Sequence, residues 1–238
     1  MANWITHMRI ADEVLRRLPD LDQLGFCIGS IAPDCNVENE GWTAFTPSRE
    51  VTHWMSGQSK YKTFDDCETF CDRCIQGRRF ADPQERSFYL GYYAHLIADV
   101  MWTEFTLNEQ RVQAMWRRIR AVPELAEKAQ DAPETYESIR QLFAKPLRSA
   151  DVIALENEYL YAHPQTAYLT VLQTVRSFPD YLDYLPKGAI LRKIGVMGGV
   201  PERYTGTNKE IFFTREEMEQ YVADTCDEIV KRLSALQV

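Results

Sequence analysis

The stretch of sequence that decides the fold reads Tyr89-Leu90-Gly91-Tyr92-Tyr93-Ala94-His95-Leu96-Ile97-Ala98-Asp99-Val100-Met101-Trp102. It is an apolar run long enough for a helix, and it carries two side chains of metal-binding type, His95 and Asp99. Because they lie four residues apart, a helix places them on one face. Such an apolar helix is expected to be buried, so the pair needs a partner that offsets its desolvation. Alone, the pair allows two interpretations, a buried His–Asp hydrogen bond and a metal site.

The rest of the chain also shows mainly helical spacing, with weak strand signals and no repeat. We expect the central helix to run from Pro83 to about residue 106. Further helices are expected over residues 7–18, 21–31, 48–55, 63–76, 107–122, 151–161, 165–178 and 214–233. Residues 179–207, which hold several glycines and prolines, are expected to form a long ordered loop. The sequence therefore predicts an all-α fold, with residues 1–238 as a single multi-helix domain.

Local signals place several helix starts. Thr214 followed by Glu217 predicts a capping box at the last helix. Thr6 is expected to be an N-cap. Thr46 is expected to be an N-cap with proline at the next position, and Pro133 is also expected at a first helical position.

Composition limits the partners and the location of the protein. The hydrophobic content of 45% suffices for a sizeable core, and the formal charge of −8 argues against a nucleic-acid backbone as the main partner. No stretch reaches the roughly 18 apolar residues of a membrane span, so no stable membrane insertion is expected. The first residues carry no signal-peptide pattern. We therefore expect a cytoplasmic protein; its oligomeric state is open.

The six cysteines fit that location. Cys67, Cys71 and Cys74 recur on one stripe of a predicted helix. Three thiols there could bind a soft metal, but zinc sites more often use CxxC pairs, which favours core or half-buried thiols. No disulfide framework is expected in a reducing compartment.

The chain has only four histidines, so their positions are informative. Three of them precede residue 100 and lie on or at the start of predicted helices: His7, His53 and His95. Asp34 follows Pro33, which bends the chain at a helix end and leaves the carboxylate at the start of a loop. Together with Asp99, these residues form a set of three histidines and two carboxylates. Such a set is suitable for one or two Zn²⁺-like ions.

A known family carries the same residues in the same order. The segments are Thr6-His7, Ile28-Gly29-Ser30-Ile31-Ala32-Pro33-Asp34, Thr52-His53 and Leu90-Gly91-Tyr92-Tyr93-Ala94-His95-Leu96-Ile97-Ala98-Asp99. This ordered set resembles the zinc-dependent phospholipase C family, which includes the amino-terminal domain of glycosylphosphatidylinositol-specific phospholipase D. The resemblance covers roughly the first 105 residues. It implies an all-α fold of the phospholipase C and P1 nuclease type.

The resemblance also implies a role for each residue. Asp34, His53, His95 and Asp99 match the ligands of one zinc ion. Asp99 matches the carboxylate that bridges to a second ion, and His7 matches a histidine on that second ion. The aspartate at the position of Asp34 is also a candidate general base for the attacking water. The implied cofactor is one or two Zn²⁺ ions, and other divalent transition metals stay open.

The sequence departs from the family pattern at two places. Secreted members bind the second ion through the amine of an N-terminal tryptophan, whereas Trp4 here follows three residues and is expected to pack in the core. The family binds a third ion through a further histidine and an H-x-x-x-E pair. No histidine stands between Asp99 and His163, and Pro164 follows His163. The third site is therefore expected to be absent, and His163 is expected at a helix end.

These patterns favour a metal-dependent hydrolase of phosphoric esters, with Asp34 as the catalytic base. The substrate would be a small-molecule or lipid phosphoester. A soluble ester is at least as plausible as a lipid, because the chain lacks an export signal and basic residues that would approach anionic lipid. The alternative is a non-catalytic metal-binding or interaction protein that retains a degenerate site. A phosphohydrolase of the HD type is disfavoured, because the chain has no His-Asp dipeptide.

Overall fold

The structure is a computed structural model that describes residues 3–57, 59–206 and 208–236. The first part of the chain contains helices α1 (Trp4–Arg17) and α2 (Gln23–Gly29), a 3-10 helix (Ala32–Asp34), strands β1 (Val37–Glu38) and β2 (Phe45–Thr46), and helices α3 (Arg49–Thr52), α4 (Phe64–Cys74) and α5 (Pro83–Leu107). The second part contains α6 (Glu109–Arg120), α7 (Pro123–Lys128), α8 (Tyr136–Leu142), α9 (Lys145–Ala162), a π-helix (Tyr168–Leu172), α10 (Ala189–Met197) and α11 (Arg215–Ala235). The two short strands pair antiparallel. The predicted all-α fold is confirmed.

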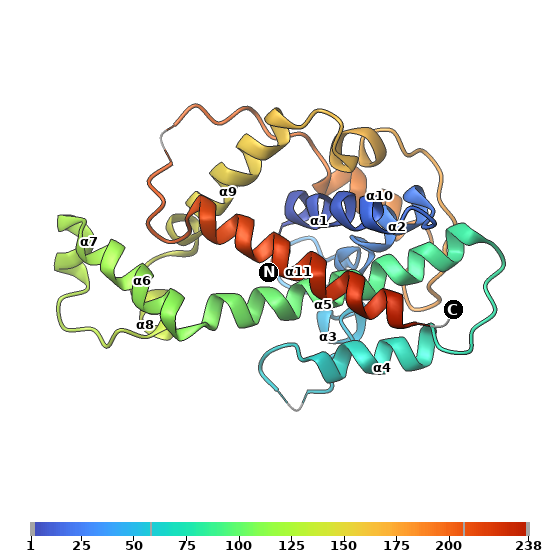
Figure 1. The fold of residues 1–238 in the computed structure, drawn as a ribbon, viewed down its shortest axis with the longest axis horizontal. Helices are drawn as coiled ribbons and strands as arrows, with labels where there is room; N and C mark the ends of the chain where they lie inside the picture. The colour runs from blue at the N-terminus through green and yellow to red at the C-terminus, as the bar shows by residue number, and fades with distance from the viewer. Residues whose placement is uncertain (1–2, 58, 207, 237–238) are drawn as a thin grey trace.

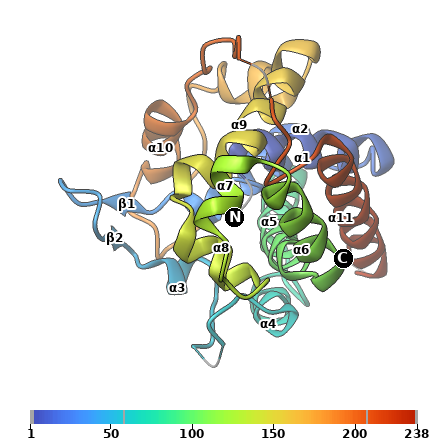
Figure 2. The ribbon, with the colours of Figure 1, turned by 90° about the vertical axis from the view of Figure 1, so that its left-hand side faces the viewer.

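Helix α5 runs through the middle of the molecule, with α1 and α2 above it, α4 below it and α11 alongside (Figures 1 and 2). It begins where the Asp82 side chain accepts a hydrogen bond of 2.8 Å from the backbone N–H of Glu85, with Pro83 in the first turn. Residues 87–100 are all buried, as the apolar sequence predicts. Tyr221 joins α11 to α5, because its hydroxyl donates a hydrogen bond of 2.9 Å to the carbonyl of Ala98.

Glycines allow α2 and α5 to approach closely. A Cβ on Gly29 would lie 2.1 Å from the carbonyl oxygen of Phe88, and a Cβ on Gly91 would lie 2.2 Å from that of Phe26. Both distances are far below van der Waals contact, so neither position accepts a side chain without movement of the backbone. The two helices are therefore locked at a spacing that only glycine permits.

A smaller apolar cluster lies at the other end of α5. It is built from α6, α7, α8 and the segment that contains Ile211 and Phe212, and Trp116 is fully buried in it. In Figure 1 these helices extend to the left, away from the main core. The interpretation of residues 1–238 as one domain stays a prediction.

The thiols of α4 lie in the core, as expected. Cys67 and Cys71 are buried and Cys74 is half-buried, and all six cysteines are free. Among the described residues, no helix is both long enough and apolar enough to cross a membrane. The expected cytoplasmic location stays a prediction.

Two predicted segments differ from the structure. Residues 165–178 do not form a long helix, and only the short π-helix lies there. One reason is that the Asp12 carboxylate accepts the backbone N–H of Ala167 and the hydroxyl of Thr166, which fixes the first turn locally. The expected loop over residues 179–207 contains α10, which begins after Gly188 in the left-handed conformation and buries Ile190 and Ile194. Because glycines and prolines stand on both sides of α10, the amphipathic pattern of this short helix was not recognised in the sequence.

Three predicted helix starts were also wrong. Helix α1 begins at Trp4, so Thr6 lies inside it. Ser48 takes the N-cap position of α3, after a cis peptide bond between Thr46 and Pro47. Thr135, rather than a residue before Pro133, caps α8. The capping box of Thr214 and Glu217 is confirmed. Only Thr135 caps its helix through its side chain, which accepts from the backbone N–H of Ser138; Asn3 and Ser48 occupy the N-cap positions of α1 and α3 without a side-chain hydrogen bond.

The glycine contact makes a direct prediction about stability. We expect Gly91→Ala to lower the free energy of unfolding by about 1–3 kcal/mol, because the new methyl group overpacks the contact with α2. Urea unfolding followed by circular dichroism measures the change. The control is Gly195→Ala on α10, where no atom lies within 4 Å of the added Cβ. An equal effect of the two substitutions would contradict the tight helix contact.

Candidate metal centre

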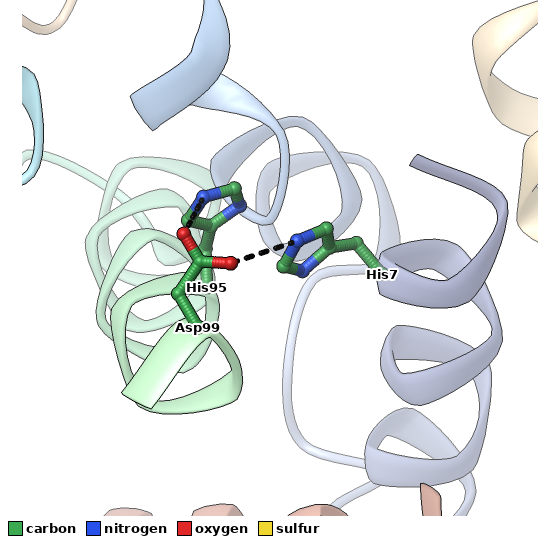
Figure 3. A group of neighbouring side chains, drawn as sticks. All are labelled: His7, His95 and Asp99. Carbon is green, nitrogen blue, oxygen red and sulfur yellow. Dashed lines mark ion pairs between the residues drawn. The ribbon is translucent and has the colours of Figure 1, made fainter. Parts of the chain in front are cut away.

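Helix α5 presents His95 and Asp99 one turn apart, as the sequence predicts. The Nε2 atom of His95 lies 3.6 Å from Oδ2 of Asp99, and their side chains are at most 1% exposed. His7 of α1 faces the same carboxylate, with its Nε2 atom 3.8 Å from Oδ1 of Asp99. Figure 3 shows the two imidazoles beside the carboxylate, and their rings stack with centroids 4.1 Å apart. These three side chains form one side of the centre.

The other side comes from the segment between α2 and α4. His53 follows the last residue of α3, and its Nε2 atom lies 3.5 Å from Oδ1 of Asp34 and 3.5 Å from Oδ2 of Asp99. Asp34 ends the 3-10 helix that contains Pro33. The structure therefore brings all five residues singled out in the sequence to one place; their role as ligands stays a proposal.

Backbone carbonyls fix the orientation of two imidazoles. The Nδ1 atom of His95 lies 2.8 Å from the carbonyl oxygen of Ser30, and that of His53 lies 3.2 Å from the carbonyl oxygen of Arg49. A carbonyl can only accept, so Nδ1 of His95 carries the proton and its Nε2 carries the lone pair, which points into the centre. Nδ1 of His53 also lies 3.0 Å from the hydroxyl of Thr52. Metal-binding histidines are held by carbonyl partners in this way.

The atoms that face the centre lack hydrogen-bond partners among the described residues. They are Nε2 of His7, Nε2 of His53, Nε2 of His95 and Oδ1 of Asp99, and each is buried. Burial lowers the pKa of His7 to about 3 and that of His53 to about 4, and it holds the pKa of His95 well below its usual value. The histidines are therefore neutral at pH 7. Neutral imidazoles with unsatisfied lone pairs beside two carboxylates fit a divalent ion of the zinc type.

The donor atoms form two overlapping triads. His7, His95 and Asp99 make one, and Asp34, His53 and His95 make the other; within each, the donor atoms lie within 4.8 Å of one another. His95 belongs to both. The five donors therefore surround a common space rather than two separate ones.

The C-terminal half of the chain holds the start of α1 in place. Glu156 of α9 is buried and accepts hydrogen bonds from Asn3 over 2.6 Å and from the hydroxyl of Thr6. Burial raises the pKa of Glu156 above its usual value. Because Thr6 precedes His7, this contact fixes the turn of α1 that presents His7.

Sequence reasoning missed three residues at the centre. Lys62 and Arg49 both form ion pairs with Asp99, and the Arg49 distance is 3.5 Å. Trp4 is buried in the core as expected, but its indole N–H also donates to Oδ2 of Asp34 over 3.3 Å. Arg49 stands four residues before His53, a helical spacing that could have suggested a shared face. The spacing of Lys62 gives no such signal, because it lies in a loop.

A cavity of about 450 Å³ opens beside Asp34, His53 and Arg49. Its remaining walls are largely apolar and include Trp4, Trp42, Phe45, Ile153, Tyr168 and Met197. Tyr92, Tyr93 and Trp102, which lie near His95 and Asp99 in the sequence, do not line it. Tyr92 and Tyr93 are buried in the core, and Trp102 stacks on Phe213 with ring centroids 5.2 Å apart.

The model of the zinc dependent phospholipase C family matches residues 6–107. The chain is similar to that family over this segment. All five residues of the centre lie within it, and the resemblance seen in the sequence is confirmed. The all-α fold is of the phospholipase C type. Neither the curated proteins nor the solved structures gave a match. The family and the cluster of histidines and aspartates together support metal-dependent, phospholipase C-like chemistry and indicate zinc binding.

His163 is the only histidine that follows Asp99 in the sequence. This histidine follows the last residue of α9, is exposed and stacks on Tyr159 with ring centroids 4.1 Å apart. The expected helix-end position is confirmed. His163 therefore serves as a control for the histidines of the centre.

The geometry of the centre predicts which substitutions remove the metal. We expect His95→Ala and Asp99→Ala to reduce bound zinc by at least tenfold, because His95 and Asp99 both face the common space. His163→Ala should keep the wild-type zinc content. Elemental analysis of the purified, dialysed proteins measures the zinc. Wild-type zinc in both centre variants would show that these residues are not ligands.

Proposed function

We propose that the protein is a metal-dependent hydrolase of phosphoric esters, with zinc bound by His7, Asp34, His53, His95 and Asp99. The observation that carries the proposal is the set of buried, unpartnered donor atoms inside the family segment. Leaving such atoms unsatisfied costs about 1–3 kcal/mol each, so a protein retains them where a ligand completes them.

A zinc ion in this centre supplies Lewis-acid polarisation of a phosphoryl oxygen and activation of a water nucleophile. Asp34 is placed to take the proton from that water. Its side chain is 16% exposed and lines the cavity, whereas that of Asp99 is 1% exposed. The indole of Trp4 donates to Oδ2 of Asp34, and Oδ1 lies 3.5 Å from Nε2 of His53. We therefore propose Asp34 as general base as well as ligand.

Arg49 is placed to bind the phosphoryl group. It lines the cavity, its side chain is 39% exposed, and it forms an ion pair with Asp99 at the base of the centre. A guanidinium presents several N–H groups in a plane and binds phosphate oxygens through charge-assisted hydrogen bonds. In the proposed complex, Arg49 orients the phosphorus over the centre.

The cavity favours an ester whose alcohol portion is apolar. Its rim carries Trp42, Ile153 and Met197, which are 49–50% exposed. Large apolar side chains grouped at the mouth of a cavity are typical of a surface that buries apolar ligand atoms. We propose a phosphoester with an apolar or aromatic leaving group; a lipid and a smaller soluble ester share this chemistry.

A second candidate function is a metal-binding or interaction protein without catalysis. The observation that favours it is that His163, the only histidine after Asp99, lies at an exposed helix end. Under this alternative the centre would bind zinc for stability only. Zinc bound without hydrolysis of any ester would support it.

Removal and return of the metal tests the proposed activity. We expect the purified protein to hydrolyse p-nitrophenyl phosphate or bis-p-nitrophenyl phosphate, to lose this activity on chelation and to regain it with one equivalent of zinc. His95→Ala should stay inactive after zinc is added, and His163→Ala should behave as wild type. Activity that survives chelation, or that His95→Ala retains, would contradict the proposal.

The cavity wall predicts substrate preference. We expect Ile153→Asp to raise KM for a naphthyl or acyl-chain phosphoester by about tenfold or more, because the cavity then loses apolar burial worth about 1–2 kcal/mol. Its kcat on p-nitrophenyl phosphate should stay near wild type. Leu147→Asp is the matched control, because Leu147 is 43% exposed on the same helix and does not line the cavity. Equal effects of the two substitutions would exclude the cavity as the binding site.

A further inference from the structure

Lys62 brings a buried ammonium group into the metal centre. It lies in the loop between α3 and α4, its side chain is 10% exposed, and it forms an ion pair with Asp99. The side chain of Asp99 is 1% exposed, so this ion pair is largely shielded from water. Arg49 reaches the same oxygen of Asp99 over 3.5 Å. Two positive side chains therefore meet one ligand carboxylate.

The loop that carries Lys62 is fixed at both ends by one buried side chain. Asp66 of α4 accepts the backbone N–H of Ser56 over 2.9 Å and that of Thr63 over 2.9 Å. Thr63 also caps α4 through a reciprocal capping box with Asp66. Because Thr63 directly follows Lys62, this clamp sets where the lysine backbone lies. The ion pair with Asp99 is therefore part of a built loop and not a chance contact of a surface side chain.

The charges of the centre limit how many ions it holds. The histidines are neutral, and the formal charges of Lys62 and Arg49, which both pair with Asp99, offset those of the carboxylates of Asp34 and Asp99. One divalent ion leaves a charge that a doubly negative phosphoryl group neutralises. Two divalent ions would leave twice that charge in a buried space, which is strongly unfavourable.

The available donor atoms also indicate a single metal ion. His95 belongs to both triads, but its Nδ1 atom is used by Ser30, so only the single lone pair on Nε2 is left. One lone pair binds one ion. A second ion would have to be held without His95, at His7 and Oδ1 of Asp99, while Lys62 pairs with Oδ2 of the same carboxylate.

We propose that the centre holds a single divalent ion and that the ammonium of Lys62 takes the place of a second cation beside Asp99. This inference rests on the proposed function. In this arrangement Lys62 supplies fixed positive charge toward the phosphoryl group from the side of Asp99, as Arg49 does from the cavity. Lys62 makes the electrostatic contribution that a second ion makes in a two-metal site.

Zinc titration of the full chain tests this inference with a readout that does not depend on activity. Calorimetry and elemental analysis are applied to wild type, Lys62→Met, Lys62→Arg and the control Lys60→Met, an exposed lysine of the same loop. We expect one zinc equivalent in wild type and at least tenfold tighter zinc binding in Lys62→Met, because a like charge beside the ion is gone. Lys62→Arg and Lys60→Met should stay within a few-fold of wild type.

Hydrolysis of p-nitrophenyl phosphate gives the second readout. We expect Lys62→Met to lose at least 100-fold in kcat although it binds zinc more tightly, and Lys62→Arg to retain most activity. A second zinc equivalent that appears only in Lys62→Met also supports the inference. Circular dichroism and thermal melting confirm that each variant is folded.

Four results would overturn the inference. Two equivalents of zinc in wild type would do so while leaving the proposed function intact. Unchanged zinc affinity in Lys62→Met, or full activity in that variant, would show that the ammonium is not part of the working centre. No zinc in wild type would overturn both this inference and the proposed function.

Discussion

The close approach of α2 and α5 is the constraint on which the metal centre depends. Gly29 and Gly91 leave no room for a side chain between the two helices. At this spacing the carbonyl of Ser30, the residue after α2, reaches Nδ1 of His95. That hydrogen bond turns the Nε2 lone pair inward. The same helix end leads into Pro33 and delivers Asp34 to the opposite side of the centre. A change in helix spacing would therefore disturb two ligands together.

Burial then determines the chemistry of the donors. The three imidazoles lie where protonation is unfavourable, so burial lowers their pKa values and keeps their nitrogens available to a metal. Neutral donors and two carboxylates would be costly to bury without a cation. The protein offers two cations of its own, Lys62 and Arg49, and an ion completes the set. In the proposed function, the balance between these charges links metal binding to the recognition of an anionic phosphoryl group.

The sequence was informative where local spacing carries the signal. The i, i+4 spacing of His95 and Asp99 and the capping box of Thr214 concern residues close together in the chain, and the structure matches both. Asp34, expected at the start of a loop, instead ends a 3-10 helix that contains Pro33. The convergence of His7, Asp34 and His53 on α5 needed more than spacing. It was expected because an ordered set of short segments resembles the zinc-dependent phospholipase C family.

Other parts could not be predicted, because long-range contacts create them. Lys62 reaches Asp99 only because Asp66 closes the loop at both ends, and no periodicity records that. Ile153 and Met197 reach the cavity from α9 and α10, outside the family segment. The amphipathic pattern of helix α10 was not recognised, because glycines and prolines stand on both sides of it.

The central claim is that imidazole nitrogens and carboxylate oxygens of this chain bind one metal ion. X-ray absorption at the zinc edge of the zinc-loaded protein tests it most directly. The account predicts nitrogen and oxygen ligands at about 2.0–2.2 Å, with imidazole scattering and no second metal at about 3.5–4 Å. Zinc bound to sulfur at about 2.3 Å would place the ion on the cysteines and would contradict the account.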